Sequence, residues 1–211
     1  MKKRILTLTC ILLMMNAGPA AAAPALNGMT GEITTPSADV LHTGQFSLGY
    51  YRFADGNSRA FDASIACRWE IGAVNFNYDN HTSTSHLNVK YALARETLLK
   101  PGLAIGAEDI GGDGKRSLYA VMSKQLPFGY RLHMGIGNGR FSGPFGAVEK
   151  TLTPLHGLSS NNVFPATTLI VECDGRGMNY GARMAIVPGV KLDAGWRARL
   201  HSAYFGLSLT I

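Results

Sequence analysis

Charged and hydrogen-bonding side chains alternate with apolar residues in several segments of about ten residues. Arginines outnumber acidic residues among them, and a planar guanidinium donates paired hydrogen bonds to carboxylates. If the segments enclose a common interior, these side chains form either a polar path for an anionic or hydroxyl-rich glycan or a polar core of paired charges. The candidates for this interior are Arg68, Glu70, Lys90, Arg131, His133, Arg183, Lys191, Asp193, Arg197 and Arg199.

The sequence predicts no catalytic residue, no metal site and no cofactor. A G-x-S-x-G nucleophile motif is absent, and the glycines of 135–139 lack the helix that a dinucleotide-binding loop requires. Asp109 and Asp113 do not have the spacing of a calcium loop and indicate a turn. The six histidines form no pair at a ligand spacing, so His133 is interpreted as a hydrogen-bonding group beside Arg131.

Residues 1–23 have the features of a cleaved secretory signal peptide. Three basic residues are followed by the apolar run 5–15, which has about half the roughly 20 residues needed to span a bilayer, and then by small residues up to Ala23. Cleavage reduces the 20 basic residues to 17, against 14 acidic ones. This small excess gives no indication of nucleic-acid binding. We expect residues 24–43 to form an irregular N-terminal head and residues 44–211 to form one β-domain.

Apolar and polar residues alternate through most of this β-domain. The segment 190–200, for example, places Trp196 on an apolar face and Arg197 on the opposite face. A period of two predicts β-strands, and turn signals such as DGRG at 174–177 separate them. We predict about twelve antiparallel strands (10 to 12), near 45–53, 60–70, 72–79, 85–95, 102–109, 116–125, 129–138, 145–152, 166–173, 177–187, 190–199 and 202–211.

The small size of the polar-face residues favours a barrel with this face inside. Glycine accounts for 25 of the 211 residues, and several glycines share the polar face with charges, such as Gly195 beside Asp193. Glycine weakens an exposed strand, but on a concave inner face it makes room for long charged side chains. The bulky opposite face is therefore predicted to contact outer-membrane lipid through Trp69, Tyr91, Leu192, Trp196, Phe205, Leu207 and Leu209.

The last strand has a pattern typical of outer-membrane barrels. Tyr204 and Gly206 are followed by the apolar residues Leu209 and Ile211, although the final isoleucine departs from the usual terminal aromatic residue. This strand is expected to contact the barrel-assembly machinery. A closed barrel is also the one arrangement in which strands can cross lipid with every backbone group paired.

Five stretches of the chain are similar in order to those of a known family: GMTGEITTPSADVLHTGQFSLGYYRF (28–53), GLAIGAEDIGGDG (102–114), YAVMSKQLP (119–127), GIGNGRFSGPFGAVEK (135–150) and ECDGRGMNYGARMAIVPGVKLDAGWR (172–197). They resemble the YjbH-like family of Gram-negative exopolysaccharide-associated outer-membrane proteins. The resemblance implies a β-barrel that acts in the production or export of extracellular polysaccharide, with the polysaccharide or other export components as partners.

The sequence therefore predicts an all-β, antiparallel outer-membrane barrel that is structural or transport-associated and is not an enzyme. Two other classes remain open: a soluble periplasmic β-protein that binds glycan or lipid, and an outer-membrane enzyme acting on lipid or sugar.

Cys67 and Cys173 remain after export, and the sequence is compatible with a disulfide or with two free thiols.

Overall fold

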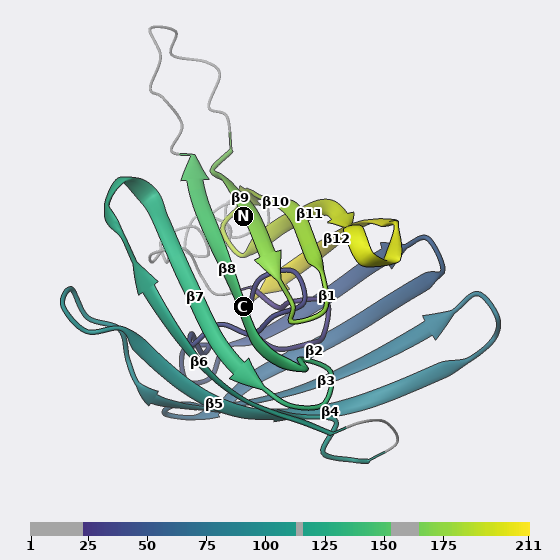
Figure 1. Ribbon diagram of the computed structural model, residues 1–211, viewed down its shortest axis with the longest axis horizontal. Coiled ribbons are helices and arrows are strands. Elements are labelled where there is room, and N and C mark those ends of the chain that lie inside the picture. The colour runs from purple at the N-terminus through teal and green to yellow at the C-terminus, as the bar shows by residue number, and fades with distance from the viewer. Residues whose placement is uncertain (1–22, 113–115, 153–164) are drawn as a thin grey trace, which may run out of the picture.

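The computed structural model describes residues 23–112, 116–152 and 165–211, so the predicted signal peptide lies outside the described residues except for Ala23. Twelve antiparallel strands pair in sequence order, and β1 pairs with β12 to close a barrel (Figure 1). This confirms the predicted barrel and its number of strands. The strands are β1 (Phe46–Phe53), β2 (Gly56–Ala66), β3 (Trp69–Tyr78), β4 (Ser83–Ala94), β5 (Gly102–Glu108), β6 (Ser117–Gln125), β7 (Tyr130–Gly137), β8 (Gly143–Leu152), β9 (Thr167–Cys173), β10 (Met178–Val187), β11 (Val190–Arg197) and β12 (Ser202–Thr210).

Helical structure in the described ranges is confined to two short 3-10 turns, η1 (Pro127–Gly129) and η2 (Ala198–Leu200). Within these ranges no helix is long and apolar enough to cross a membrane.

The barrel has two rims, which we name by the chain ends. The terminal rim carries the start of β1, the end of β12 and the turn between β2 and β3. The distal rim carries the turns that join β1 to β2, β7 to β8, β9 to β10 and β11 to β12.

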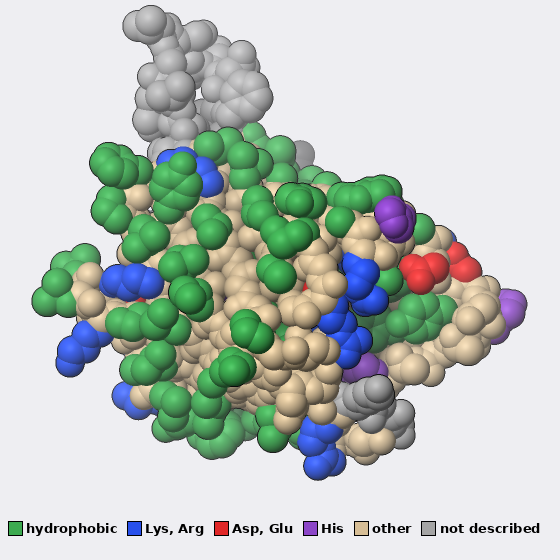
Figure 2. All heavy atoms as spheres, in the orientation of Figure 1, with side chains coloured by type: hydrophobic (Ala, Val, Ile, Leu, Met, Phe, Trp, Pro, Cys, Tyr) green, Lys and Arg blue, Asp and Glu red, His purple; other side chains and the backbone are tan. Residues whose placement is uncertain are grey.

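Side chains alternate between the two faces of each strand because a strand has a period of two. In β12, Phe205 and Leu207 are exposed, whereas Tyr204 and Ser208 are buried. Apolar side chains are spread over the outer wall that faces the viewer in Figure 2. All seven residues predicted to face lipid lie on the outer face, namely Trp69, Tyr91, Leu192, Trp196, Phe205, Leu207 and Leu209.

Aromatic residues pair on the outer face near both rims. Trp69 at the start of β3 lies opposite Tyr91, with 4.7 Å between ring centroids. Near the distal rim, Tyr180 of β10 lies opposite Trp196 of β11. Aromatic girdles of this kind mark the two lipid–water interfaces of membrane barrels.

Glycines on the inner face make room for aromatic rings, which differs from the predicted role of accommodating long charged side chains. A Cβ atom at Gly206 would overlap the ring of Tyr51, and one at Gly181 would overlap the hydroxyl of Tyr204. Both tyrosines are fully buried. The inner face is therefore more aromatic than its alternating pattern suggested.

Cys67 lies in the turn between β2 and β3, and Cys173 ends β9 at the opposite rim. Both thiols are free and exposed. They do not form the disulfide that the sequence left open.

Candidate functional site

The segment 23–41 lies inside the barrel and is almost entirely buried. We name it the N-terminal plug; it is the purple trace enclosed by the strands in Figure 1. Its backbone turns back on itself through hydrogen bonds such as Gly31 N to Ala23 O at 3.0 Å and Leu26 N to Ile33 O at 2.9 Å. The segment is irregular and occupies the interior of the barrel, a position that the sequence did not indicate.

Glu172 of β9 holds the middle of the plug. Its carboxylate accepts hydrogen bonds from the backbone amides of Ile33, Thr34 and Thr35 at 2.9 to 3.1 Å. The hydroxyls of both threonines and the side-chain amide of Asn179 also donate to it. A buried carboxylate is stable only when its lone pairs are satisfied in this way, so Glu172 and the plug depend on each other.

Glu70 of β3 forms a second anchor together with Lys90 of β4. Their side chains make a fully buried ion pair at 3.1 Å. Glu70 accepts hydrogen bonds from the amides of Thr30 at 2.8 Å and Leu41 at 3.0 Å, and Lys90 donates to the carbonyl of Thr30 at 2.9 Å. The plug supplies the additional hydrogen bonds that a buried ion pair needs to offset its desolvation cost.

Arg183 of β10 forms a third anchor. It donates to the carbonyl oxygens of Gly31 at 3.1 Å and Glu32 at 2.9 Å, and its Nε donates to Asp193 of β11 at 2.6 Å. Asp193 thus orients the guanidinium that binds the plug backbone.

Apolar residues of the plug complete two interior clusters with the barrel wall. Leu26 and Ile33 pack with Tyr51, Ile170 and Tyr204 among others. Ala38 joins a second cluster of inward-facing residues, which are Ala104, Tyr119, Val121, Phe141 and Phe145. Burial of these side chains adds a hydrophobic contribution to the polar anchors.

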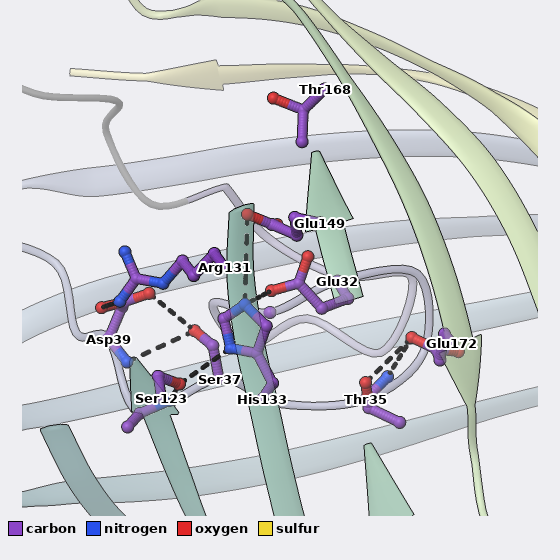
Figure 3. A network of polar contacts seen from close by, with 12 residues as sticks. Glu32, Thr35, Ser37, Asp39, Ser123, Arg131, His133, Glu149, Thr168 and Glu172 are labelled. Carbon is purple, nitrogen blue, oxygen red and sulfur yellow. Dashed lines mark hydrogen bonds and ion pairs between the residues drawn. The ribbon is translucent and has the colours of Figure 1, made fainter. Parts of the chain in front are cut away.

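Glu32 of the plug meets His133 of β7 and Glu149 of β8 in the interior (Figure 3). The Nε2 atom of His133 lies 3.2 Å from Glu32 and 4.0 Å from Glu149. On the other side of the ring, Nδ1 lies 2.8 Å from the hydroxyl of Ser123. Burial raises the pKa of Glu32 well above its usual range, and the nearby Glu149 carboxylate acts in the same direction.

A pocket of about 290 Å³ opens at the distal rim above the plug, and we name it the distal vestibule. Asn27 and Thr34 of the plug belong to its lining, and Arg140 connects the two parts by donating to the carbonyl of Thr34 at 2.7 Å. The plug therefore forms part of the wall of the distal vestibule.

The lining of the distal vestibule combines positive charge with aromatic rings. Four arginines face two carboxylates, Glu108 and Asp174. Phe76 and Tyr78 stack at 6.4 Å between centroids, and His86 meets Phe76 edge-on at 5.6 Å. Figure 2 shows Lys and Arg side chains gathered beside a hollow on the right of the view. The four arginines of the vestibule lining, as given by the pocket geometry, are Arg140, Arg176, Arg197 and Arg199.

Nine of the ten candidate interior residues lie inside the barrel or at its distal opening, in different settings. Glu70, Lys90, Arg183 and Asp193 hold the plug, as does Arg131, which donates to Asp39 at 2.8 Å. His133 belongs to the cluster in Figure 3, and Lys191 lies on the inner face of β11 opposite Ser208. Arg197 and Arg199 line the distal vestibule.

Arg68 differs from its predicted position on the lumen face. A register shift between Ser64 and Ala66 ends the regular alternation of β2, and the chain turns at Cys67 and Arg68. Arg68 is exposed and has a positive φ of 77°. The predicted strand 60–70 therefore ends at Ala66, and Arg68 does not line the lumen.

Several residues of the site were not among the candidates, including Glu172, Glu149 and Glu32. The period of two in β8 and β9 places Glu149 and Glu172 on the inner face, so this signal could have found them. Glu32 lies in an irregular segment, where no periodic pattern predicts the direction in which its side chain points.

Comparison with known families assigns the chain to a class of exopolysaccharide proteins. Residues 25–160, which include the plug and most of the barrel, match the family described as "Exopolysaccharide biosynthesis protein YbjH". The chain belongs to this family, which confirms the resemblance of the sequence stretches. A comparison with curated protein sequences gives no match.

Two solved structures are similar in shape. One is described as "KdgM porin in complex with disordered oligogalacturonate", with a TM-score of 0.49, 8% identity, and 79% of this chain and 97% of that chain covered. The other is described as "Unveiling the Mechanism Behind the in-meso Crystallization of Membrane Proteins", with a TM-score of 0.44, 10% identity, and 80% and 83% covered.

Proposed function

We propose that this barrel spans the outer membrane and serves exopolysaccharide export as a non-enzymatic component. In this proposal the distal vestibule binds an acidic, hydroxyl-rich glycan, and the N-terminal plug closes the path behind it. Membership in the exopolysaccharide family supports a role in exopolysaccharide export. The arginines of the distal vestibule support an acidic glycan as its ligand.

The apolar outer face favours a protein inserted into a membrane over a soluble periplasmic protein. Large apolar side chains such as Leu118, Ile136 and Phe205 are between 52% and 62% exposed there. A soluble barrel would leave this surface in water, and extended apolar surfaces are rare on soluble monomers. The aromatic pairs near both rims fit lipid–water interfaces.

The observation that carries the glycan proposal is the set of arginines around aromatic rings in the distal vestibule. Arginine binds carboxylates in a bidentate manner, and the apolar faces of sugar rings pack on aromatic side chains. Arg197 stacks on Phe53 at 4.5 Å, and Arg176 and Arg199 are exposed in the lining of the vestibule. The vestibule can therefore offer donors to a uronic acid without first breaking every internal contact.

One arrangement in the interior is reminiscent of a catalytic triad. Ser123, His133 and Glu32 form a serine–histidine–carboxylate series, which is the pattern of an activated nucleophile. However, Ser123 is fully buried, and its hydroxyl accepts the amide hydrogen of Ala38 at 2.8 Å. The plug thus covers the position from which a substrate would have to approach, which supports a structural role for the series.

Binding to the purified full chain in detergent micelles tests the glycan proposal. We expect an oligogalacturonate to bind and a neutral maltooligosaccharide of equal length to bind at least tenfold more weakly. Arg176→Gln together with Arg199→Gln should weaken oligogalacturonate binding at least tenfold, whereas Lys100→Gln at the terminal rim should leave it unchanged. Equal binding of both oligomers, with no effect of the arginine substitutions, would contradict a glycan site in the distal vestibule.

A further inference from the structure

The geometry points to a zinc-binding site formed by Glu32, His133 and Glu149, which ties the N-terminal plug to the barrel wall. One carboxylate comes from the plug, and the other two ligands come from β7 and β8. The site lies inside the barrel and is separate from the distal vestibule, so this proposal does not depend on glycan binding.

The distances between the donor atoms suit one shared cation. Zinc binds imidazole nitrogen and carboxylate oxygen at about 2.0–2.2 Å, so two ligands of one ion lie roughly 3 to 4 Å apart. The Nε2 atom of His133 lies 3.2 Å from Glu32 and 4.0 Å from Glu149. The three donor atoms all lie within 4.8 Å of one another, and rotation about the broad terminal torsion of a glutamate covers the remaining difference.

Buried polar atoms in the cluster lack hydrogen-bond partners. His133 is 1% exposed and Glu32 is 2% exposed. Oε2 of Glu32 has no hydrogen-bond partner in the described part of the chain. Nε2 of His133 makes ion-pair contacts with Glu32 and Glu149 but meets no hydrogen-bond criterion with either. Unsatisfied groups of this kind are rare in native interiors, and a bound cation is a species that would satisfy them.

The charges of the cluster also favour a divalent cation. Two carboxylates lie side by side away from water, which is costly unless positive charge is present. The nearby arginines are engaged elsewhere, because Arg183 binds Asp193 and the plug backbone, and Arg131 binds Asp39 and Glu96. Lys191 of β11 also contributes positive charge near both carboxylates, but a single ammonium balances only one of them. One zinc ion would neutralise both carboxylates and leave the histidine neutral.

Ser123 supports the histidine in the form that binds metals. Ligating histidines usually donate their second ring N–H to a neighbouring group, which fixes the tautomer and the ring orientation. The Nδ1 atom of His133 lies 2.8 Å from the hydroxyl of Ser123. When Nδ1 donates to this hydroxyl, the lone pair of Nε2 faces the two carboxylates.

Imidazole among the ligands favours zinc over calcium and magnesium, which prefer sites built from oxygen.

Because Glu32 belongs to the plug, zinc would bind the plugged state more tightly than a state in which the plug has left the barrel. Bound zinc should therefore stabilise the plugged barrel in proportion to its occupancy.

The test uses the full chain folded in detergent micelles, with zinc affinity measured by competition with a chromophoric chelator. We expect one zinc ion per chain and at least 100-fold weaker binding of calcium and magnesium. Glu149→Gln, which preserves side-chain volume, and His133→Gln should each weaken zinc binding at least tenfold. Ser123→Ala should weaken it by about tenfold through the lost orientation of the ring. Asp79→Asn, which alters an exposed carboxylate at the distal rim, is the matched control and should leave the affinity unchanged.

A heat-modifiable gel shift establishes that each variant is folded, and Glu149→Gln alone decides the proposal if His133→Gln does not fold. X-ray absorption of the zinc-loaded chain should give one nitrogen and two carboxylate ligands. Absence of one-to-one zinc binding, or an affinity that Glu149→Gln leaves unchanged, would overturn the proposal. Without zinc binding, the cluster would be held by the contacts of His133 with Glu32 and Glu149 alone. An affinity that Glu149→Gln leaves unchanged would place the zinc ion at exposed histidines.

Discussion

Glu172 accepts two hydrogen bonds from Thr35, one from its backbone amide at 3.0 Å and one from its hydroxyl at 2.9 Å. The two residues are 137 positions apart in the sequence. This long-range contact, in which the last third of the chain binds its first described residues, holds the N-terminal plug inside the barrel. Five of the ten predicted interior residues also hold the plug, namely Glu70, Lys90, Arg131, Arg183 and Asp193.

Glu172→Gln should loosen the plug. A carboxamide has a single oxygen acceptor, so some of the donors on Ile33, Thr34 and Thr35 would lose their partner, at a cost of about 1–3 kcal/mol each. A loss of about 2 kcal/mol in local stability corresponds to roughly 30-fold faster hydrogen exchange at these three amides. Asp55→Asn at the exposed distal rim is the control. Equal exchange in Glu172→Gln and in the control would mean that Glu172 does not anchor the plug.

Loss of two anchors should make the barrel conduct ions. We expect the intact chain in a planar bilayer to show low conductance, because the plug and the side chains packed on it fill the interior. Glu70→Gln together with Glu172→Gln should increase the frequency of open events severalfold, since both carboxylates bind plug amides. A large, steady conductance of the intact chain would contradict a closed interior.

Leu192→Arg should impair insertion, because a cation near the midplane of a lipid-facing surface costs roughly 2–4 kcal/mol. Arg197→Ala should be milder, because Arg197 lines the distal vestibule on the inner side of the same strand. Unfolding by urea in lipid vesicles measures both effects. Equal destabilisation by the two substitutions would contradict the assigned faces of β11.

Gly206→Ala should destabilise the barrel by about 1–3 kcal/mol, as expected for overpacking of a filled interior. The added methyl group would overlap the buried ring of Tyr51. Gly111→Ala is a matched control, since a Cβ there meets no atom within 4 Å. The temperature of the heat-modifiable gel shift should fall for Gly206→Ala alone. Identical behaviour of the two variants would indicate that the interior has room beside Tyr51.

The sequence predicts the strands well because membrane-barrel strands repeat apolar and polar residues with a period of two. It places Trp69, Leu192 and Phe205 on the correct outer face for this reason. Arg68 shows the limit of the rule, because the register shift between Ser64 and Ala66 ends the alternation before residue 68.

The position of the plug could not be predicted from the pattern. Residues 23–41 have no periodicity, and their place depends on hydrogen bonds to side chains far away in the sequence, such as Glu70 and Glu172. The same hydrogen bonds from the plug also stabilise the buried charges of these inner-face side chains. The cluster of Glu32, His133 and Glu149 is equally hidden, since its members come from three separate segments.

The central claim is that the outer face contacts lipid, and the two tryptophans of the chain, Trp69 and Trp196, test it most directly. They lie on the outer face near opposite rims. Their fluorescence should be strongly quenched by brominated lipid in reconstituted vesicles and only weakly by aqueous iodide. Quenching by iodide without quenching by brominated lipid would place both rings in water and contradict the account.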